Sequence, residues 1–317
     1  MIIGALDLGS NSYHLLVARV EADGRLTRVG SFKESLKLGA LVQAHGMVPP
    51  EAFRHAVETV RSMVDRAHAL GAERIAAVGT SALREARNGE ALVRAMGEAS
   101  GVFPEIVSGE MEGDLVYRGA RARFWGQVER VGVIDLGGGS VEIVAGAGDT
   151  RLHVESLPLG FLRVGRMLGL GGALDESERA LVARHVDNVM REASKRLRAH
   201  APSAWLLSGG TARALGDLVL AEPRDALSTR ALGELAQKLA THDAARLRAL
   251  GVDASRAEGF GLGVLLLSEV VQRLGAREVH VSPGGLREGL VLRELSQAKA
   301  DSSVILSRGN LSTRMTA

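Results

Sequence analysis

Apolar and polar residues alternate along the chain in blocks that predict amphipathic helices and short strands in turn. After Pro49-Pro50, which favours a helix start, apolar side chains recur at helical spacing from Phe53 to Leu70, and Gly71 ends the pattern. Later blocks predict strands at 75–78, 106–107, 205–207 and 279–281, and helices at 90–100, at 176–200, after Gly209-Gly210 and after Pro283. Because helix and strand alternate, we expect an α/β protein with a parallel or mixed sheet.

One pattern occurs twice. The segment from Ala5 to Val17 aligns without a gap with the segment from Val133 to Ala145. Each copy has an apolar strand, an aspartate, a tight turn of small polar or glycine residues and a second apolar strand, which predicts a β-hairpin with a carboxylate at the end of its first strand. The two copies are about one domain length apart, so the chain is expected to consist of two related halves.

The chain has 317 residues, which at roughly 150 residues per domain suggests two domains. We place the boundary near Phe124-Trp125-Gly126, with an N-terminal domain at 1–123 and a C-terminal domain at 124–295. The tail from Gln297 is rich in serine and threonine and is expected to fray. We expect the segment 296–317 to return to the N-terminal domain.

Composition excludes several classes of protein. The net charge of +2 and the aromatic content of 3% argue against a nucleic-acid-binding protein, which would need a basic surface or stacking side chains. The absence of cysteine excludes disulfides, thiolate nucleophiles and cysteine-ligated zinc, and fits a cytoplasmic protein. The longest apolar run, Gly259 to Leu267, is too short to span a membrane, and no apolar segment of signal-peptide length precedes Asp7.

The two predicted turns are candidate phosphate sites. Turns of glycine and serine expose several backbone N–H groups at once, and such a concave nest binds anions. Two facing nests would hold one phosphate chain between them. The residues concerned are Gly9, Ser10, Asn11 and Ser12 in the first turn and Gly137, Gly138, Gly139 and Ser140 in the second.

The aspartates at the base of the turns, Asp7 and Asp135, would repel phosphate unless a cation lay between them. This indicates Mg²⁺, bridging in part through water. Glu142 follows on the returning strand of the second copy, near enough to serve the same ion, and His14 has the equivalent position in the first copy.

A third glycine turn, Gly209, Gly210 and Thr211 after Ser208, stands at a predicted helix start. It could bind an anion or lie under an adenine, or it could be a plain strand-to-helix turn without a ligand. Arg163, Arg213 and Arg287 are candidates to line a phosphate path, with solvated surface arginines as the alternative.

The duplicated clamp is typical of the actin/hexokinase/Hsp70-like superfold. Within it, the sequence resembles the exopolyphosphatase and guanosine pentaphosphate phosphohydrolase (Ppx/GppA) family, over positions 7 to 289. The motifs that carry the resemblance are Asp7-Leu-Gly-Ser-Asn-Ser-Tyr-His-Leu-Leu-Val-Ala18, Thr80-Ser-Ala-Leu-Arg84, Val107-Ser-Gly-Glu-Met-Glu112, Asp135-Leu-Gly-Gly-Gly-Ser-Val-Glu142, Leu157-Pro-Leu-Gly160, Ser208-Gly-Gly-Thr211 and Leu286-Arg-Glu-Gly289.

The resemblance implies two actin-like (ribonuclease H-like) domains with a cleft between them, in the short two-domain form of the family. It implies that Glu112 is the catalytic carboxylate and that Arg84 binds phosphate oxygens. The chain departs from the family pattern at Met111, where the family has the first acid of a pair, and at Pro283, in a loop that usually carries an acid.

We therefore expect an exopolyphosphatase that depends on Mg²⁺, with K⁺ as a stimulating ion, and that forms a homodimer in the cytoplasm. Its substrate would be inorganic polyphosphate, with guanosine pentaphosphate as the close alternative. Two other classes remain open, a small-molecule kinase of the same superfold and a non-catalytic sensor of polyphosphate or nucleotide. Neither nucleic acid nor a membrane is expected as a partner.

Overall fold

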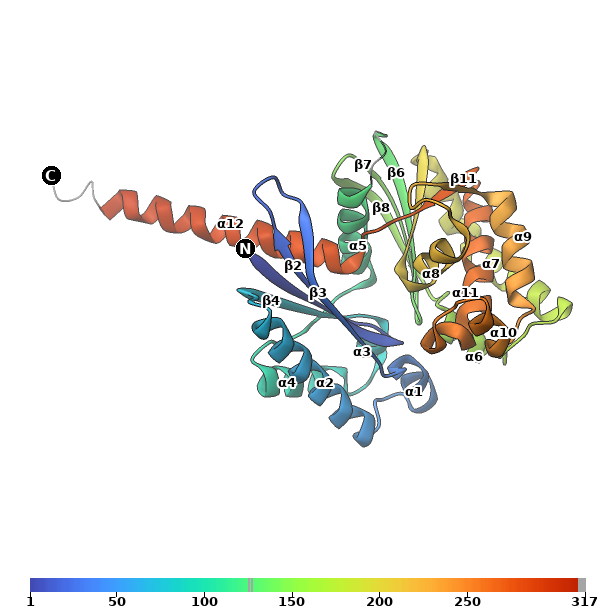
Figure 1. Cartoon of the computed structure of the whole chain (residues 1–317), viewed down its shortest axis with the longest axis horizontal. Coiled ribbons are helices and arrows are strands. Elements are labelled where there is room, and N and C mark those ends of the chain that lie inside the picture. The colour runs from blue at the N-terminus through green and yellow to red at the C-terminus, as the bar shows by residue number, and fades with distance from the viewer. Residues whose placement is uncertain (125, 127, 313–317) are drawn as a thin grey trace.

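The computed structural model describes residues 1–124, 126 and 128–312, with side chains as far as residue 300. It contains two β-sheets surrounded by helices, and Figure 1 shows them as two lobes with the helices α5 (Gly109–Arg123) and α12 (Leu286–Ser312) between them. Among the described residues no helix is both long and apolar enough to cross a membrane.

The first sheet has five strands in the order β3-β2-β1-β4-β5. Its central strand β1 is buried along most of its length, as expected for a strand covered on both faces. The elements of this lobe are β1 (Ile2–Leu8), β2 (Ser12–Val20), β3 (Leu26–Ser35), α1 (Leu38–His45), α2 (Pro50–Ala69), β4 (Arg74–Gly79), α3 (Ser81–Glu85), α4 (Gly89–Ser100) and β5 (Glu105–Ile106).

The second sheet has six strands in the order β10-β11-β9-β6-β7-β8. The longest helix of this lobe, α7, begins at a capping box in which Asp175 and Glu178 satisfy each other's backbone N–H groups. The elements are β6 (Arg130–Leu136), β7 (Val141–Ala147), β8 (Thr150–Leu157), α6 (Phe161–Met167), α7 (Glu176–Ala199), β9 (Ala204–Ser208), α8 (Gly209–Val219), β10 (Ala226–Ser228), α9 (Thr229–Ala240), α10 (Ala244–Ala249), α11 (Ala254–Leu274) and β11 (Glu278–Val281).

The sequence repeat is a structural repeat. Strands β1 and β2 pair antiparallel with Asp7 opposite His14, and β6 and β7 pair in the same way with Asp135 opposite Glu142. A third strand, β3 or β8, pairs antiparallel with the second strand of each hairpin, and the next strand along the chain, β4 or β9, pairs in parallel with the first. Even the β-bulge recurs at the equivalent place, between Val17 and Ala18 and between residues 145 and 146. The expected α/β fold with two related halves is confirmed.

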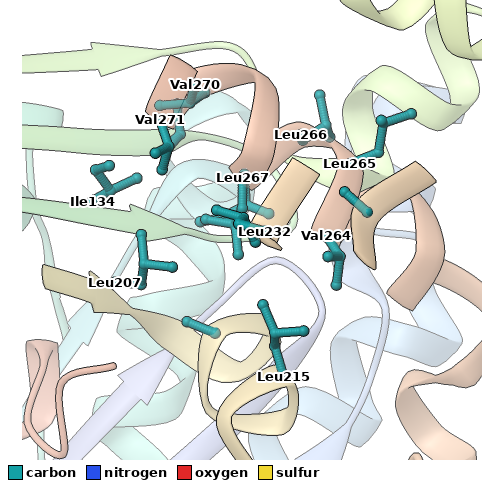
Figure 2. Packing of buried hydrophobic residues seen from close by; sticks show 14 of the residues in the cluster. Ile134, Leu207, Leu215, Leu232, Val264, Leu265, Leu266, Leu267, Val270 and Val271 are labelled. Atoms are coloured by element: carbon teal, nitrogen blue, oxygen red, sulfur yellow. The ribbon is translucent and has the colours of Figure 1, made fainter. Parts of the chain in front are cut away.

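The largest core cluster lies in the second lobe, where β6 and β9 pack against α8, α9 and α11. Figure 2 shows Leu265, Leu267 and Val271 of α11 among side chains from the strands and from the neighbouring helices. Nearly every residue from Phe260 to Val271 is buried, which explains why this stretch has no polar face in the sequence. A helix apolar on all sides is one enclosed by the protein.

Helices α5 and α12 cross between the lobes. In sequence α5 precedes the second lobe, yet it packs on β6, β7 and β8, whereas α12 packs on β1 of the first lobe. The two helices also pack on each other closely enough that a Cβ on Gly119 would lie 1.9 Å from the carbonyl oxygen of Gly285. An apolar cluster from both sheets and both helices fills the junction.

Most predicted elements are present within two residues of their expected limits, including α2, β4, α4, α7 and β11. The expectation that the tail frays from Gln297 is wrong for the backbone up to Ser312, because α12 continues to that residue. The sequence contains no proline after Pro283 and has good helix formers from Gln297 to Ala300, so nothing stops the helix there. Trp125, in the expected domain boundary, lies outside the described residues, and the domain limits stay a prediction.

Candidate active site

A cavity of about 180 Å³ lies between the lobes, and both hairpin loops line it. Every residue of the three glycine turns and every predicted metal ligand borders this cavity, as does Glu112. The predicted residues at the cavity are Asp7, Gly9, Ser10, Asn11, Ser12, Glu112, Asp135, Gly137, Gly138, Gly139, Ser140, Glu142, Gly209, Gly210 and Thr211. Arg84 does not border the cavity, although it contacts Glu112.

The first loop is held by backbone donors at the start of α1. The carbonyl of Ser10 accepts from the N–H of Gly39 at 2.7 Å, and that of Asn11 accepts from the N–H groups of Leu36 and Lys37 at 3.2 and 2.9 Å. Because a peptide unit is planar and trans, the N–H that follows each anchored carbonyl points the opposite way. The carbonyls of Ser10 and Asn11 are therefore tied to the start of α1, and the N–H groups that follow them, of Asn11 and Ser12, point the other way, while the N–H of Gly9 donates to the carbonyl of Ser12 at 3.2 Å.

The second loop has room only for glycine at its tip. A Cβ on Gly139 would lie 2.3 Å from Ser81 Oγ and 2.8 Å from Ser10 Oγ, and a Cβ on Gly138 would lie 3.4 Å from the Cβ of Ser10. The two loops thus meet across the cavity, with the side chain of the first loop placed against the bare backbone of the second.

The acids at the base of the loops are desolvated. Desolvation raises the pKa of Asp7 to about 6, although Arg287 opposes the shift, and it also raises the pKa of Asp135 against the effect of Arg213. Glu142 is 1% exposed, and burial raises its pKa to about 7 even though Ser156 Oγ donates a hydrogen bond to it at 2.8 Å. Desolvation and then Arg287 lower the pKa of His14 in the equivalent position.

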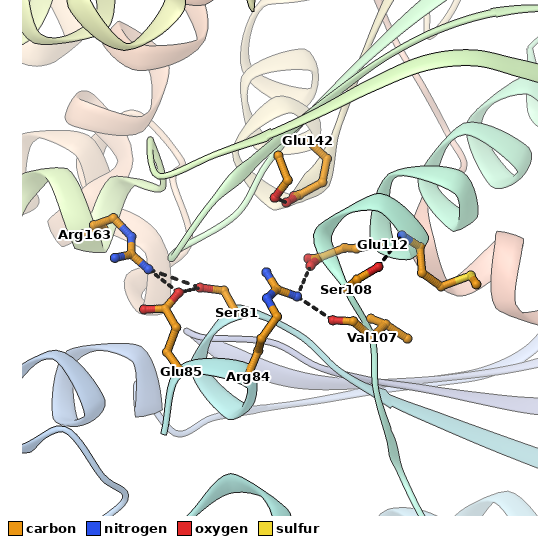
Figure 3. A network of polar contacts seen from close by, with 10 residues as sticks. Ser81, Arg84, Glu85, Val107, Ser108, Glu112, Glu142 and Arg163 are labelled. Carbon is orange, nitrogen blue, oxygen red and sulfur yellow. Dashed lines mark hydrogen bonds and ion pairs between the residues drawn. The ribbon is translucent and has the colours of Figure 1, made fainter. Parts of the chain in front are cut away.

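Glu112 lies in the first turn of α5, where Ser108 caps the helix by accepting from the N–H of Met111 at 3.1 Å. Burial raises the pKa of Glu112 well above its usual value, repulsion from Glu142 adds to the rise, and Arg84 opposes it. Figure 3 shows the guanidinium of Arg84 between its two acceptors, with Nη1 at 3.2 Å from Glu112 Oε2 and 2.6 Å from the carbonyl oxygen of Val107. Glu112 thus has a fixed position and a raised proton affinity.

The third glycine turn begins α8 beside Asp135. Gly209 has φ of +91°, and a Cβ there would lie 2.6 Å from Asp135 Oδ1, so glycine is required both by the backbone and by the close approach. Gly210 lies under the guanidinium of Arg256, whose Nη1 is 1.9 Å from the position of a Cβ. The turn forms a part of the cavity wall, and the guanidinium of Arg256 lies against it.

Three arginines border the cavity, namely Arg213, Arg256 and Arg287. Desolvation lowers the pKa of Arg256 and of Arg287, and repulsion from Arg213 lowers both further. Sequence reasoning found Arg213 and Arg287 but missed Arg256, which follows the N-cap Asp253 of α11 and has no glycine motif around it. Arg163, the third expected arginine, is not among the residues that line the cavity.

The acids fit a magnesium ion that takes most of its ligands from elsewhere. Asp135 Oδ1 is buried and has no hydrogen-bond partner in the described part of the chain, which leaves it free to bind a cation. Within those residues no three histidine or acidic side chains are close enough to form a metal cage by themselves. Mg²⁺ typically keeps several waters and uses one or two carboxylates together with substrate phosphates, so this donor set suits it.

The two departures from the family pattern lie outside the cavity lining. Met111 is 39% exposed, and in this position an acid would not border the cavity. Pro283 precedes Gly284, whose carbonyl oxygen accepts from Ser282 Oγ at 2.9 Å, and Glu288 Oε2 then accepts from the N–H of Gly285 at 2.9 Å. The loop therefore ends in an ordered start to α12, which carries Arg287 into the cavity.

A duplicated α/β fold whose two glycine loops face one another across a cavity with acids and arginines defines a class of phosphate-handling enzymes. The chain matches the model of the Ppx/GppA phosphatase family over residues 16–298 and belongs to that family. The resemblance and the expected hydrolase class are confirmed.

Relatives of known name match the sequence over nearly the whole chain. Exopolyphosphatase 1 of Mycobacterium tuberculosis is 28% identical over 328 residues, which cover 100% of this chain and 94% of the relative. A guanosine-5'-triphosphate,3'-diphosphate pyrophosphatase of Vibrio vulnificus is 28% identical over 323 residues, which cover 99% of this chain and 63% of the relative.

Solved structures share the fold. The crystal structure of an exopolyphosphatase from Cytophaga hutchinsonii has a TM-score of 0.85 at 22% identity and covers 94% of this chain and 98% of its own. The Aquifex aeolicus member of the Ppx/GppA family has a TM-score of 0.79 at 23% identity, covering 94% and 98%.

Proposed function

We propose that this protein hydrolyses the terminal phosphoanhydride of inorganic polyphosphate and releases orthophosphate. The observation that carries the proposal is the pair of glycine loops, which face one cavity from opposite lobes together with Arg213, Arg256 and Arg287. The alternative substrate is guanosine pentaphosphate, converted to the tetraphosphate, and it is favoured by the name of the Vibrio relative.

The arginines support a polyanionic substrate. Like charges brought together in a desolvated cavity repel one another, and Arg213 disfavours the charged forms of both Arg256 and Arg287. A phosphate chain would replace that repulsion with charge-assisted hydrogen bonds.

Glu112 is proposed to orient the attacking water and to accept its proton. The water oxygen bonds to the terminal phosphorus, the bridging P–O bond breaks, and the shortened chain leaves with the electron pair. The N–H groups of the two loops donate to the phosphoryl oxygens where charge develops. The raised pKa of Glu112 suits a base that works near neutral pH.

Asp7 and Asp135 would hold Mg²⁺, with Glu142 assisting. Bound there, the ion would neutralise charge on the phosphate oxygens. The homodimer, the cytoplasmic location and stimulation by K⁺ also remain proposals, which size-exclusion chromatography with light scattering, cell fractionation and a cation titration test respectively.

The experiment is a phosphate-release assay that offers polyphosphate and guanosine pentaphosphate separately, without an acceptor molecule. We expect release from polyphosphate to be faster. Faster release from the nucleotide would establish the alternative. Release only when an acceptor is added would identify a kinase instead, and binding without release from either substrate would identify a sensor.

A further inference from the structure

The second glycine loop is oriented by the start of α6. The N–H groups of Phe161 and Leu162 donate to the carbonyls of Gly137 and Gly138 at 3.2 and 3.0 Å. The carbonyl of Gly139 is reached by a side chain instead, because Arg163 Nε donates to it at 2.7 Å. The N–H of Ser140, which belongs to the same peptide unit as that carbonyl, is thereby turned the opposite way.

The same guanidinium reaches the other lobe. Arg163 Nη2 donates to Glu85 Oε1 and lies 3.4 Å from Ser81 Oγ, and Ser81 Oγ itself donates to Glu85 at 2.7 Å. Desolvation would raise the pKa of Glu85, but the bonds from Arg163 and Ser81 outweigh it and lower the pKa. Figure 3 shows Arg163 coming from the second lobe and meeting Ser81 and Glu85 on α3 of the first.

Glu85 directly follows Arg84, the residue that contacts Glu112. Helix α3 has only five residues, so a bond that fixes Glu85 also limits how the helix that carries Arg84 can rotate. A continuous set of contacts therefore joins the Gly139 carbonyl in the second lobe, through Arg163, Glu85 and Arg84, to the carboxylate of Glu112.

We propose that Arg163 is a positioning residue that couples closure of the two lobes to alignment of the phosphate loop and of Glu112. It does not line the cavity, and its Nε and Nη2 donate to Gly139 and Glu85, so we do not assign it as a phosphate ligand. The kinetic test of this proposal rests on the proposed function. Lobe closure gives a second test that does not depend on catalysis.

The test is a double-mutant cycle on Arg163→Gln and Glu85→Ala, assayed for phosphate release from polyphosphate. Each single variant should lower kcat about 10- to 100-fold, the scale of a lost charge-assisted hydrogen bond, while KM changes less than about threefold. The double variant should be no worse than Arg163→Gln alone. Arg163→Lys should restore only part of the loss, because one ammonium cannot hold Gly139 and Glu85 together.

Arg166→Gln is the matched control. Arg166 lies one turn along α6 and also crosses to the first lobe, where Nη1 donates to the carbonyl of Ala40 at 2.9 Å, but within the described part of the chain its side chain has no hydrogen bond to either loop. It should leave kcat within about twofold. If Arg163→Gln lowers kcat no more than this control, or raises KM alone, or adds fully to Glu85→Ala, the proposal is wrong.

Solution X-ray scattering without substrate separates this proposal from the proposed function. Arg163→Gln should increase the radius of gyration while circular dichroism and the melting temperature show a folded protein, whereas an unchanged radius overturns the coupling to closure. If the wild-type protein releases no phosphate from either substrate, the proposed function fails, and the scattering comparison still decides whether Arg163 closes the lobes.

Discussion

The two hairpin loops have the same backbone plan and opposite side-chain content. The first carries Ser10 and Asn11 at its tip, and the second carries Gly138 and Gly139 in the equivalent positions. The reason is that the loops face each other. The Ser10 side chain of the first loop and Ser81 of α3 fill the space that a side chain on the second loop would need. The two copies of the duplicated loop are thus complementary in shape, with side chains on the first and bare backbone on the second.

The loops are also anchored differently. Backbone N–H groups alone hold the carbonyls of Ser10 and Asn11, so the first anchor depends little on which side chains are present. The last carbonyl of the second loop is held by the side chain of Arg163. We infer that substitutions of the residues around the loops should disturb the second loop more than the first.

A third difference is charge. Asp7 faces His14 across its hairpin, and Asp135 faces Glu142. Desolvation favours the neutral form of both side chains, so it lowers the pKa of His14 and raises the pKa of Glu142. The second hairpin therefore brings two carboxyl groups to the cavity, Asp135 and Glu142, whereas the first brings Asp7 and a histidine.

The largest effect is expected at Glu112. Glu112→Gln should keep the fold and substrate binding but lower kcat about 10²- to 10⁴-fold, because an amide can bond to water but cannot accept its proton. Steady-state kinetics with a binding measurement on the same sample provide the check. A kcat within about threefold of wild type would place the base elsewhere.

The next effect concerns the aspartates. Asp135→Ala should raise the Mg²⁺ concentration for half-maximal activity on the order of 10- to 100-fold, and more than Asp7→Ala does, since only Asp135 has a buried oxygen without a partner in the described residues. Glu142→Ala should shift it in the same direction, and EDTA should silence the wild type. Full activity in EDTA would rule out the metal assignment.

Local sequence predicted the loops and their acids well, because a duplicated strand, turn and strand is a short-range pattern that the hairpin converts directly into geometry. The acids Asp7, Asp135 and Glu142 face one cavity as expected. Helix starts with a clear signal, such as Pro49-Pro50, were also predictable.

Contacts across the cavity were not predictable from the sequence. Arg163 reaches Glu85 only because the lobes close, Arg256 reaches Gly210 only because α11 packs against α8 within the second lobe, and no local motif marks such pairs. The packing of α5 on the second sheet was missed for the same reason, although the segment 296–317 was expected to return to the N-terminal domain. It depends on how glycines such as Gly119 and Gly289 let two helices approach, and this is a property of the packing.

The complementarity of the loops can be broken by making them alike. Gly139→Asn copies the first loop into the second and places a side chain against Ser81 and Ser10, so it should hold the lobes apart and lower kcat/KM about tenfold or more. Gly171→Ala, at a glycine with open space around it, is the matched control and should have no effect. Activity of the asparagine variant equal to that of the control would mean that the loops do not meet in solution.

The smallest expected effect is on stability, and it tests the difference in charge between Glu142 and His14, which have equivalent positions in the two hairpins. Folded Glu142 has a pKa of about 7 and the unfolded residue one near 4.5, so the stability from this group is complete at low pH and is lost as the pH rises to about 7. Glu142→Gln keeps an acceptor for Ser156 and removes the ionisation. Relative to wild type it should gain about 1–3 kcal/mol in the free energy of unfolding at pH 8, and most of that gain should vanish at pH 5.

His14→Gln should show the reverse dependence on pH. The folded pKa of His14 lies below that of the unfolded residue, so the wild type loses stability as the pH falls, when only the unfolded chain takes up the proton. The glutamine variant should gain stability at pH 5 and not at pH 8. Urea unfolding in EDTA at both pH values, with unchanged m-values, measures the two variants on one scale. If His14→Gln instead gained stability at pH 8, as Glu142→Gln should, the folded pKa of His14 would lie above that of the unfolded residue, and burial and the nearby arginines would not control it.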